Sequence, residues 1–129
     1  LIVDDNAVNR LLLAKVLAVL AADLREASSG QEAVELWQSW APDLIWMDLR
    51  MPDLDGYAAT REIRQRELCQ PHTQRTPIIA ISAAGTQTSP AAALSAGCDD
   101  FIQKPFKRSQ IFDCLQQHLA LKYLYADSF

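Results

Sequence analysis

The sequence is poor in the residues that build disulfide, zinc or nucleotide sites. Its three cysteines, Cys69, Cys98 and Cys114, are odd in number and widely spaced. This pattern argues against a disulfide framework or a zinc site and favours reduced, partly buried thiols in a cytosolic protein. The four glycines are scattered along the chain, so no glycine-rich loop is available to hold a nucleotide phosphate.

The sequence also lacks long runs of one charge sign and long apolar runs. A formal net charge of −4 with no Lys/Arg run argues against a nucleic-acid-binding surface. No stretch approaches the roughly 20 apolar residues of a membrane span, so we expect no membrane segment in this chain. With 129 residues, half of them hydrophobic and 22% charged, the chain is long enough for one domain and short for two.

The two ends of the chain carry separate expectations. Leu1 is not an initiator methionine and begins inside an apolar run, so we expect a piece of a longer protein, with a signal peptide or an upstream domain left open. We predict one domain over residues 1–119. Residues 120–129 are expected to extend the last helix or to begin a linker.

Apolar runs alternate with helical patterns five times along the chain. Continuous apolar runs bounded by turn signals are typical of strands buried on both faces. The expected strands are Leu1–Val3, Leu24–Ala27, Leu44–Met47, Ile78–Ile81 and Phe101–Ile102. The expected helices run over 7–20, from 30 up to Pro42, and over 56–68, 90–97 and 107–119. This order predicts an α/β fold, a (βα)5 doubly wound parallel sheet with both faces covered.

Several helical residues carry more detailed expectations. The first helix should present one apolar stripe, with Leu13 and Leu17 beside it, formed by Val8, Leu12, Val16 and Leu20. The third should carry a charged outer face formed by Arg61, Glu62, Arg64, Arg66 and Glu67. The tryptophans, Trp37, Trp40 and Trp46, are expected to pack in the core. His118 is expected near a helix C-terminus, where it would interact with the helix dipole.

Polar side chains follow four of the five expected strands. Asp4 and Asp5 follow the first strand, Asp48 the third, Ser82 the fourth and Lys104 the fifth. Because the carboxyl ends of parallel strands meet at one edge of the sheet, these groups should share one shallow cleft. Each residue taken alone has an ordinary explanation, such as a helix cap or a solvated surface group; together they indicate a site.

The grouping has a chemical consequence. Three neighbouring carboxylates repel one another unless a cation lies among them, and hard oxygen ligands without Cys or His favour Mg²⁺. A lysine and a metal beside a carboxylate can stabilise a phosphoryl group in transfer. Asp48 would then be the nucleophile and would form an acyl phosphate. The turn formers Asp53 and Asp55 are expected to be turn residues and not ligands.

Four motifs in this order resemble the response-regulator receiver domain of two-component phosphorelays. They are Val-Asp-Asp-Asn at 3–6, Met-Asp-Leu-Arg-Met-Pro-Asp-Leu-Asp-Gly at 47–56, Ile-Ser-Ala at 81–83 and Lys-Pro-Phe at 104–106. The resemblance covers about residues 1–119. The Asp-Asp-Asn-x-x-Asn-Arg form at 4–10 is most similar to receivers attached to hybrid sensor histidine kinases. The resemblance implies a flavodoxin-like fold with strand order 2-1-3-4-5.

The resemblance also implies roles in phosphorylation and metal binding. Asp48 should accept a phosphoryl group from a phosphohistidine on a partner. Asp5, Asp48 and the backbone carbonyl of Arg50 should hold Mg²⁺, with Mn²⁺ as an alternative ion, and Asp4 should act through a water ligand. Lys104 should pair with the phosphoryl oxygens.

Further residues are implied in binding the phosphate and in the conformational switch. Ser82 should hydrogen-bond the phosphate and move toward it, and Ala83 is small enough to leave room for it. Phe101, at the switch-aromatic position, should then turn inward. It lacks the hydroxyl of a switch tyrosine. The bond between Lys104 and Pro105 is expected to be cis, as X–Pro bonds sometimes are.

The implied function is a signalling switch that changes conformation on the face of the fourth helix, fifth strand and fifth helix. Such a domain promotes its own phosphorylation and dephosphorylation without turning over an external substrate. The implied partner is a histidine kinase phosphotransfer domain or a histidine phosphotransfer protein, and a homodimer is a further expectation. The expected location is the cytoplasm, or the cytosolic part of a membrane-bound sensor kinase.

Two other functions are alternatives to a phosphoaccepting switch. A degenerate receiver could act only as a protein-interaction or dimerisation module, but every expected site residue is present. A metal-dependent phosphohydrolase with an aspartyl nucleophile needs a carboxylate two residues beyond Asp48, where this chain has Arg50.

The sequence also departs from the family at Ala21-Ala22, where a glycine commonly ends the first helix.

Overall fold

A computed structural model describes residues 1–18, 24–49, 55–70, 75–82, 90–104 and 107–127, with the side chains of 119–127 left aside. The strands are β1 (Ile2–Val3), β2 (Glu26–Ala27), β3 (Ile45–Asp48), β4 (Ile78–Ser82) and β5 (Asp100–Gln103). The helices are α1 (Ala7–Ala18), α2 (Gly30–Trp40), α3 (Gly56–Cys69), α4 (Pro90–Ala96) and α5 (Arg108–Asp127).

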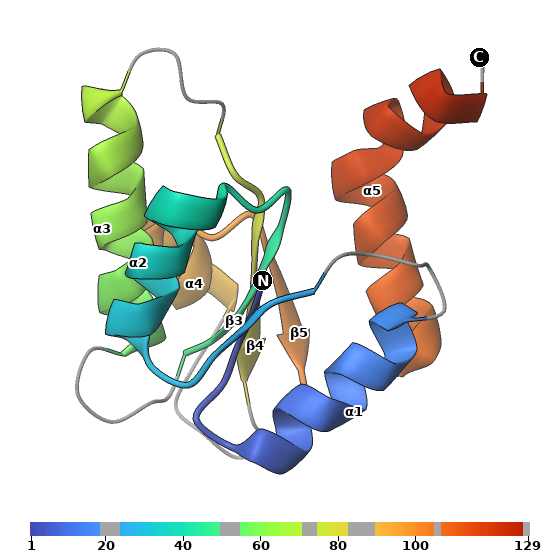
Figure 1. Cartoon of the computed structure of the whole chain (residues 1–129), viewed down its shortest axis with the longest axis horizontal. Helices are drawn as coiled ribbons and strands as arrows, with labels where there is room; N and C mark the ends of the chain where they lie inside the picture. Colours follow the sequence, from blue (N-terminus) through green and yellow to red (C-terminus); the bar gives the residue numbers. More distant parts are fainter. Residues whose placement is uncertain (19–23, 50–54, 71–74, 83–89, 105–106, 128–129) are drawn as a thin grey trace.

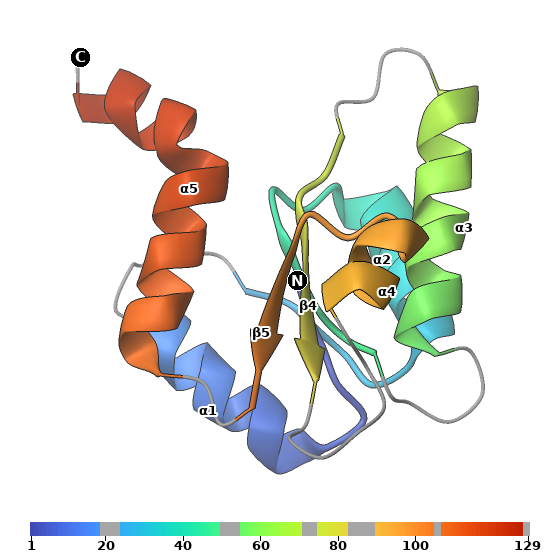
Figure 2. The same ribbon diagram turned by 180° about the vertical axis from the view of Figure 1, so that it is seen from behind.

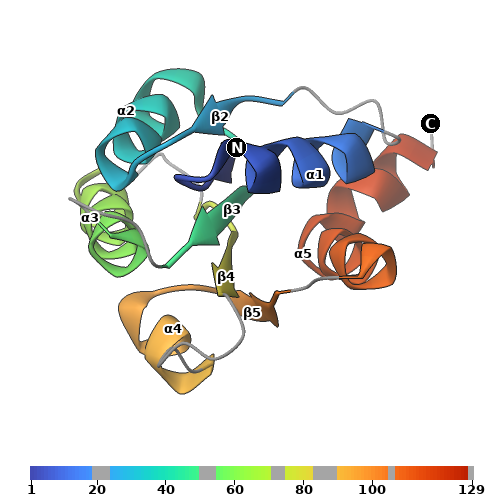
Figure 3. The ribbon, with the colours of Figure 1, turned by 90° about the horizontal axis from the view of Figure 1, so that it is seen from below.

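The strands form one parallel sheet in the order β2-β1-β3-β4-β5, which confirms the predicted fold class. Helices cover both faces: α1 and α5 lie on one side, and α2, α3 and α4 lie on the other (Figures 1 and 3). The view from behind shows α4 beside α3 and well away from α5 (Figure 2). All strands run the same way, so their carboxyl ends meet at one edge.

Each face of the sheet packs into its own apolar core. One core joins the sheet to α2, α3 and α4 through side chains that include Trp37, Ile63 and Met47. The other joins it to α1 and α5 and includes Trp46 and Ile111. The central strands β3 and β4 are buried along their whole length, which explains why they are apolar up to their last residues, Asp48 and Ser82. Trp40 is partly buried against the first core, so all three tryptophans pack as predicted.

The predicted buried stripe of α1 is wrong at two positions. Leu13 and Leu17 are buried against the sheet, whereas Val8 and Leu12 are 63% and 52% exposed. Leu11 is also exposed, at 54%. The helix carries apolar residues around much of its circumference, so its spacing pattern alone did not fix which side meets the sheet.

Local signals mark where several helices begin or end. The side chain of Ser29 caps α2 by accepting a hydrogen bond from the Glu32 N–H, and Asp55 caps α3 through the Ala58 N–H. Asp55 therefore acts as a helix cap, in agreement with its assignment as a turn residue. Helix α4 stops at Gly97, whose φ of 113° is a left-handed conformation that suits glycine.

Two expectations about charged helical residues need correction. Arg64 and Glu67 do not lie on an outer face of α3, because their side chains are only 12% and 9% exposed and pair with each other. Helix α5 continues to Asp127, so His118 lies inside the helix and not near its end. There His118 Nε2 lies 3.2 Å from Asp100 Oδ2. Within the described ranges, no helix combines the length and apolar character needed to cross a membrane.

Candidate functional site

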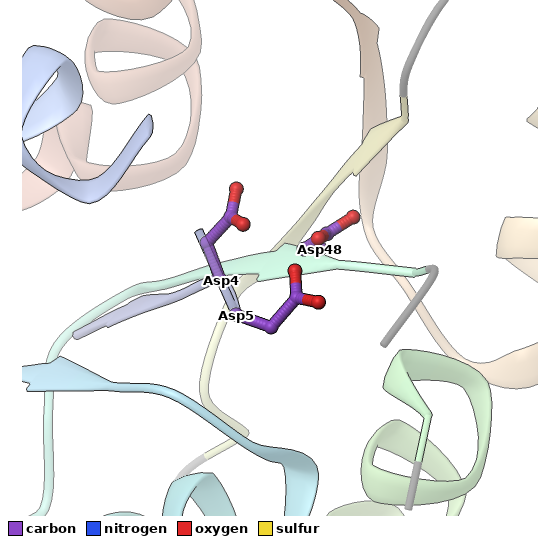
Figure 4. A group of neighbouring side chains, drawn as sticks. All are labelled: Asp4, Asp5 and Asp48. Atoms are coloured by element: carbon purple, nitrogen blue, oxygen red, sulfur yellow. The ribbon is translucent and has the colours of Figure 1, made fainter. Parts of the chain in front are cut away.

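Three carboxylates meet at the carboxyl edge of the sheet. Asp4 and Asp5 directly follow β1, and Asp48 is the last residue of β3, the neighbouring strand. One ligand oxygen from each lies within 4.8 Å of the others. Figure 4 shows the three carboxyl groups gathered at the ends of the two strands, with Asp5 next to Asp48. The structure therefore brings together the three acids that were predicted from the sequence to lie close to one another.

The three acids differ in exposure. Asp4 and Asp48 are each only 5% exposed, whereas Asp5 is exposed. Both oxygens of Asp4 have protein partners, because Oδ1 accepts the Asn6 N–H at 2.9 Å and Oδ2 accepts from Lys104. A ligand that enters from solvent therefore meets Asp5 first and Asp48 behind it.

Lys104 reaches the cluster from the end of β5. Its Nζ lies 2.8 Å from Asp4 Oδ2, and its side chain is 17% exposed. The backbone supports this position, since Lys104 N–H donates to the carbonyl of Ser82 at 2.6 Å. Lys104 pairs with one of the three carboxylates, and the mutual repulsion of three neighbouring acids favours a bound cation.

Ser82 is the last residue of β4 and is fully buried. The register places it one residue beyond Ile81, which lies beside Asp48 on β3. Several predicted features of the site lie outside the described residues: the carbonyl of Arg50, the turn residue Asp53, the small side chain of Ala83 and the Lys104–Pro105 bond. The same holds for Leu20 of the predicted apolar stripe and for Ala21-Ala22.

Gly56 lets the backbone at the start of α3 lie very close to the backbone of Asp48, a contact that the sequence did not predict. A Cβ atom at this position would lie 2.2 Å from the Asp48 carbonyl oxygen and 2.7 Å from Leu49 Cα. Only glycine lets the start of α3 pass this close to the strand end that carries Asp48. The contact could not be predicted from the sequence, because it depends on how α3 meets the end of β3.

The donor set fits a hard divalent cation. All three candidate ligands are carboxylate oxygens, and they are the one group of three or more potential ligand residues found in the described part of the chain. Mg²⁺ is usually held by one or two carboxylates together with waters. Asp5 and Asp48 lie next to each other in the cluster (Figure 4) and would supply two such carboxylates, whereas both oxygens of Asp4 accept hydrogen bonds from Asn6 and Lys104.

The predicted switch residue, Phe101, lies on β5. Phe101 is partly buried and packs against the core that faces α2, α3 and α4. The neighbouring Asp100 accepts the Phe101 N–H at 2.8 Å through Oδ1, and its Oδ2 lies near Cys114 and His118 of α5. This arrangement ties the start of β5 to α5.

Comparison with known proteins agrees with the fold and identifies the family. The family model described as "Response regulator receiver domain" matches residues 1–116. The chain therefore belongs to the response regulator receiver domain family, the receivers of two-component signalling, as its sequence motifs suggested.

Individual relatives cover both free-standing and kinase-attached receivers. The chain is 36% identical to the chemotaxis protein CheY of Bacillus subtilis, over 92% of this chain and 95% of that protein. Other curated relatives, at 34–36% identity, are histidine kinases, hybrid ones among them, of which the chain spans only 7–12%.

Two solved structures are also close. The receiver domain of the Pseudomonas aeruginosa sensor histidine kinase PA1611, with magnesium in its active site cleft, is 38% identical with a TM-score of 0.80, covering 92% of this chain and 94% of that one. The Saccharomyces cerevisiae Ssk1 receiver, in complex with the histidine phosphotransfer protein Ypd1, is 30% identical with a TM-score of 0.86, covering 94% and 88%.

Proposed function

We propose that this chain is a phosphoaccepting switch in which Asp48 takes a phosphoryl group from a phosphohistidine. The observation that carries the proposal is the meeting of Asp4, Asp5 and Asp48 with Lys104 at one edge of the sheet. An acid cluster with a single lysine provides a nucleophile, a cation site and a positive group for the incoming phosphate.

Asp5 and Asp48 would hold Mg²⁺, and Mn²⁺ could replace it; the backbone carbonyl of Arg50 would be a further ligand. The bound ion supplies positive charge that draws the phosphoryl oxygens toward the acidic cluster. Asp4 would act through a water molecule, because both of its oxygens accept hydrogen bonds from Asn6 and Lys104. Support for the ion comes from the carboxylate donor set and from the magnesium-bound receiver of PA1611.

In the transfer step, a carboxylate oxygen of Asp48 attacks phosphorus while the phosphorus–nitrogen bond of the partner's phosphohistidine breaks. The imidazole nitrogen keeps the electron pair of that bond, and Asp48 becomes an acyl phosphate. Lys104 would exchange Asp4 for a phosphoryl oxygen, a short movement for a flexible side chain. Ser82 would hydrogen-bond another phosphoryl oxygen, and the small side chain of Ala83 is predicted to leave room for the group.

The partner would dock on the first turns of α1. Val8, Leu11 and Leu12 are all more than half exposed and begin three residues after Asp5. An apolar surface beside the acidic edge suits a helical phosphotransfer domain that carries its phosphohistidine within reach of Asp48. The Ssk1 receiver bound to the phosphotransfer protein Ypd1 supports a partner of this class.

Phosphorylation would reach the rest of the molecule through Ser82 and Phe101. Ser82 would move toward the phosphate, Phe101 would turn inward, and the face of α4, β5 and α5 would change. The contacts of Asp100 with His118 and Cys114 couple β5 to α5 and support this route. We further propose a cytoplasmic site of action, alone or as the receiver of a longer kinase. Homodimerisation stays a prediction.

The test is a fluorescence titration of Trp46, which is buried two residues before Asp48. Mg²⁺ followed by beryllofluoride, a phosphoryl mimic, should change the emission of the wild type and leave Asp48→Ala unchanged. Equal responses, or no response in the wild type, would contradict the assignment of Asp48 and favour a receiver used only for protein interaction.

A companion experiment tests docking. Leu11→Glu should slow phosphotransfer from a histidine phosphotransfer protein while leaving phosphorylation by a small-molecule donor intact. Leu94→Glu is the matched control, because Leu94 is 56% exposed on α4, away from α1. If the two variants behave alike with the protein donor, the α1 surface is not the docking site.

A further inference from the structure

Arg10 connects the acidic site to the edge strand of the sheet. It lies in the first turn of α1, and its Nη1 donates to the backbone carbonyl oxygen of Asp4 at 2.7 Å. Its Nε donates to Glu26 Oε1 of β2 at 3.2 Å. The Arg10 side chain is 19% exposed, so it is largely enclosed between these partners.

The peptide that Arg10 holds is the one that carries Asp5. The carbonyl of Asp4 belongs to the peptide unit joining Asp4 to Asp5, and that unit is planar. On its other side, the Asp4 N–H donates to the Ala27 carbonyl of β2 at 3.0 Å. Asp4 is therefore fixed from both sides by β2, directly through Ala27 and indirectly through Glu26 and Arg10.

Asp5 has few other constraints. It follows the two-residue strand β1, precedes α1 and is exposed to solvent. A metal ligand at such a position needs contacts from surrounding residues to hold its orientation, because a mobile carboxylate loses conformational entropy when it binds a metal.

We propose that Arg10, held by Glu26, is a positioning residue that orients the Asp4–Asp5 peptide for Mg²⁺ binding. The inference rests on the proposed function, because it concerns the same metal site. In the described part of the chain, the side-chain partners of Arg10 are the Asp4 carbonyl and Glu26, not the carboxylates of the cluster, so Arg10 acts through the backbone.

The direction in which Mg²⁺ affinity changes when Arg10 is removed distinguishes a positioning role from a purely electrostatic one. Arg10 is a cation near a site for another cation, so Coulomb repulsion alone predicts that its removal would tighten Mg²⁺ binding. Positioning predicts the opposite, with binding weakened roughly tenfold, as for other contacts that orient metal ligands.

The experiment is calorimetric titration of Mg²⁺ into the unphosphorylated protein. Arg10→Ala should bind Mg²⁺ about tenfold more weakly. The double variant Arg10→Ala/Glu26→Ala keeps the net charge, and it should be weakened to a similar extent because the pair acts as a unit. Lys15→Ala, which removes one positive charge from an exposed position on α1, should bind like the wild type.

Urea unfolding of each variant shows whether it is folded during the titration, and Arg10→Met, which keeps the apolar stem, replaces any variant that is not. Unchanged or tighter binding in the folded Arg10 variants overturns the inference while leaving the proposed function in place. Failure of the wild type to bind Mg²⁺ at all would overturn both.

Discussion

The ammonium of Lys104 lies 2.8 Å from the carboxylate of Asp4, across 100 residues of sequence. The contact joins the ends of β1 and β5, which are separated in the sheet by β3 and β4. It holds the lysine at the acidic edge of the sheet, where β3 ends in Asp48. The pair also engages one oxygen of Asp4, the acid that is proposed to act on the ion only through a water molecule.

Replacing Lys104 by alanine should affect both stability and phosphorylation. Asp4 is buried and would lose its ionic partner, so the free energy of unfolding should fall by about 2 kcal/mol in the presence of a chelator. Mg²⁺ should reduce this loss by supplying positive charge. Phosphorylation of Asp48 by a small-molecule donor should slow on the order of a hundredfold. Urea unfolding with and without Mg²⁺, and donor kinetics, measure the two effects; equal stability losses in both conditions would contradict the account.

Gly56→Ala should disturb the strand end that carries Asp48. The new Cβ would lie 2.2 Å from the Asp48 carbonyl oxygen, so the backbone must shift, and stability should fall by about 2 kcal/mol. Gly97→Ala is the control. Its Cβ would lie 2.8 Å from Arg64 Cγ, and Gly97 has a positive φ. Gly97 precedes β5, so it lies at the other edge of the sheet from Asp4, Asp5 and Asp48. Both variants should lose stability, but only Gly56→Ala should slow phosphorylation of the folded protein. Equal phosphorylation rates would show that the approach to Asp48 has no role in the site.

Much of the fold could be predicted because the central strands are apolar without interruption and each is followed by a clear helical pattern. The site could be predicted for a related reason: polar residues at the ends of parallel strands meet at one edge, whatever the packing details. Asp4, Asp5, Asp48 and Lys104 were found in this way.

The errors concern residues whose environment depends on contacts distant in sequence. Arg64 looked like a surface charge, because its partners at 97 and 99 come from the loop after α4. Arg10 belongs to the motif at 4–10, but no structural role was predicted for it, since nothing local indicates that it reaches β2. The exposed side of α1 was misassigned because Leu12 and Leu13 are both apolar and only packing distinguishes them.

Arg64 should be a major determinant of stability. Its guanidinium donates to Asp99 and Glu67 and to the carbonyls of Gly97 and Thr76, at 2.7–2.8 Å. Arg64→Met would leave two largely buried carboxylates without this partner, and the free energy of unfolding should fall by about 3 kcal/mol. Arg66→Met is the control, since Arg66 makes an exposed i,i+4 pair with Glu62 and should change stability by less than about 0.5 kcal/mol. Urea unfolding compares the two, and similar losses would rule out the network as a determinant.

The three cysteines should differ in reactivity toward a thiol reagent. Cys69 is exposed, whereas Cys98 and Cys114 are buried. Burial raises the pKa of the Cys98 thiol; burial, followed by the negative charge of Asp100, raises the pKa of Cys114 to about 12. At neutral pH both buried thiols therefore stay protonated and unreactive. Colorimetric titration should detect Cys69 alone in the native protein and all three in denaturant, and Cys69→Ser should remove the native signal. Rapid native labelling of Cys98 or Cys114 would contradict their burial.

The most direct test of the central claim is to locate the phosphoryl group itself. The protein is incubated with Mg²⁺ and a phosphorylated histidine phosphotransfer protein, the acyl phosphate is trapped by borohydride reduction, and the peptides are identified by mass spectrometry. We predict a single modified residue, Asp48, with no modification in Asp48→Asn or in the presence of a chelator. Phosphoryl uptake at another residue, or uptake that persists in Asp48→Asn, would contradict the assignment of Asp48 as the phosphoacceptor.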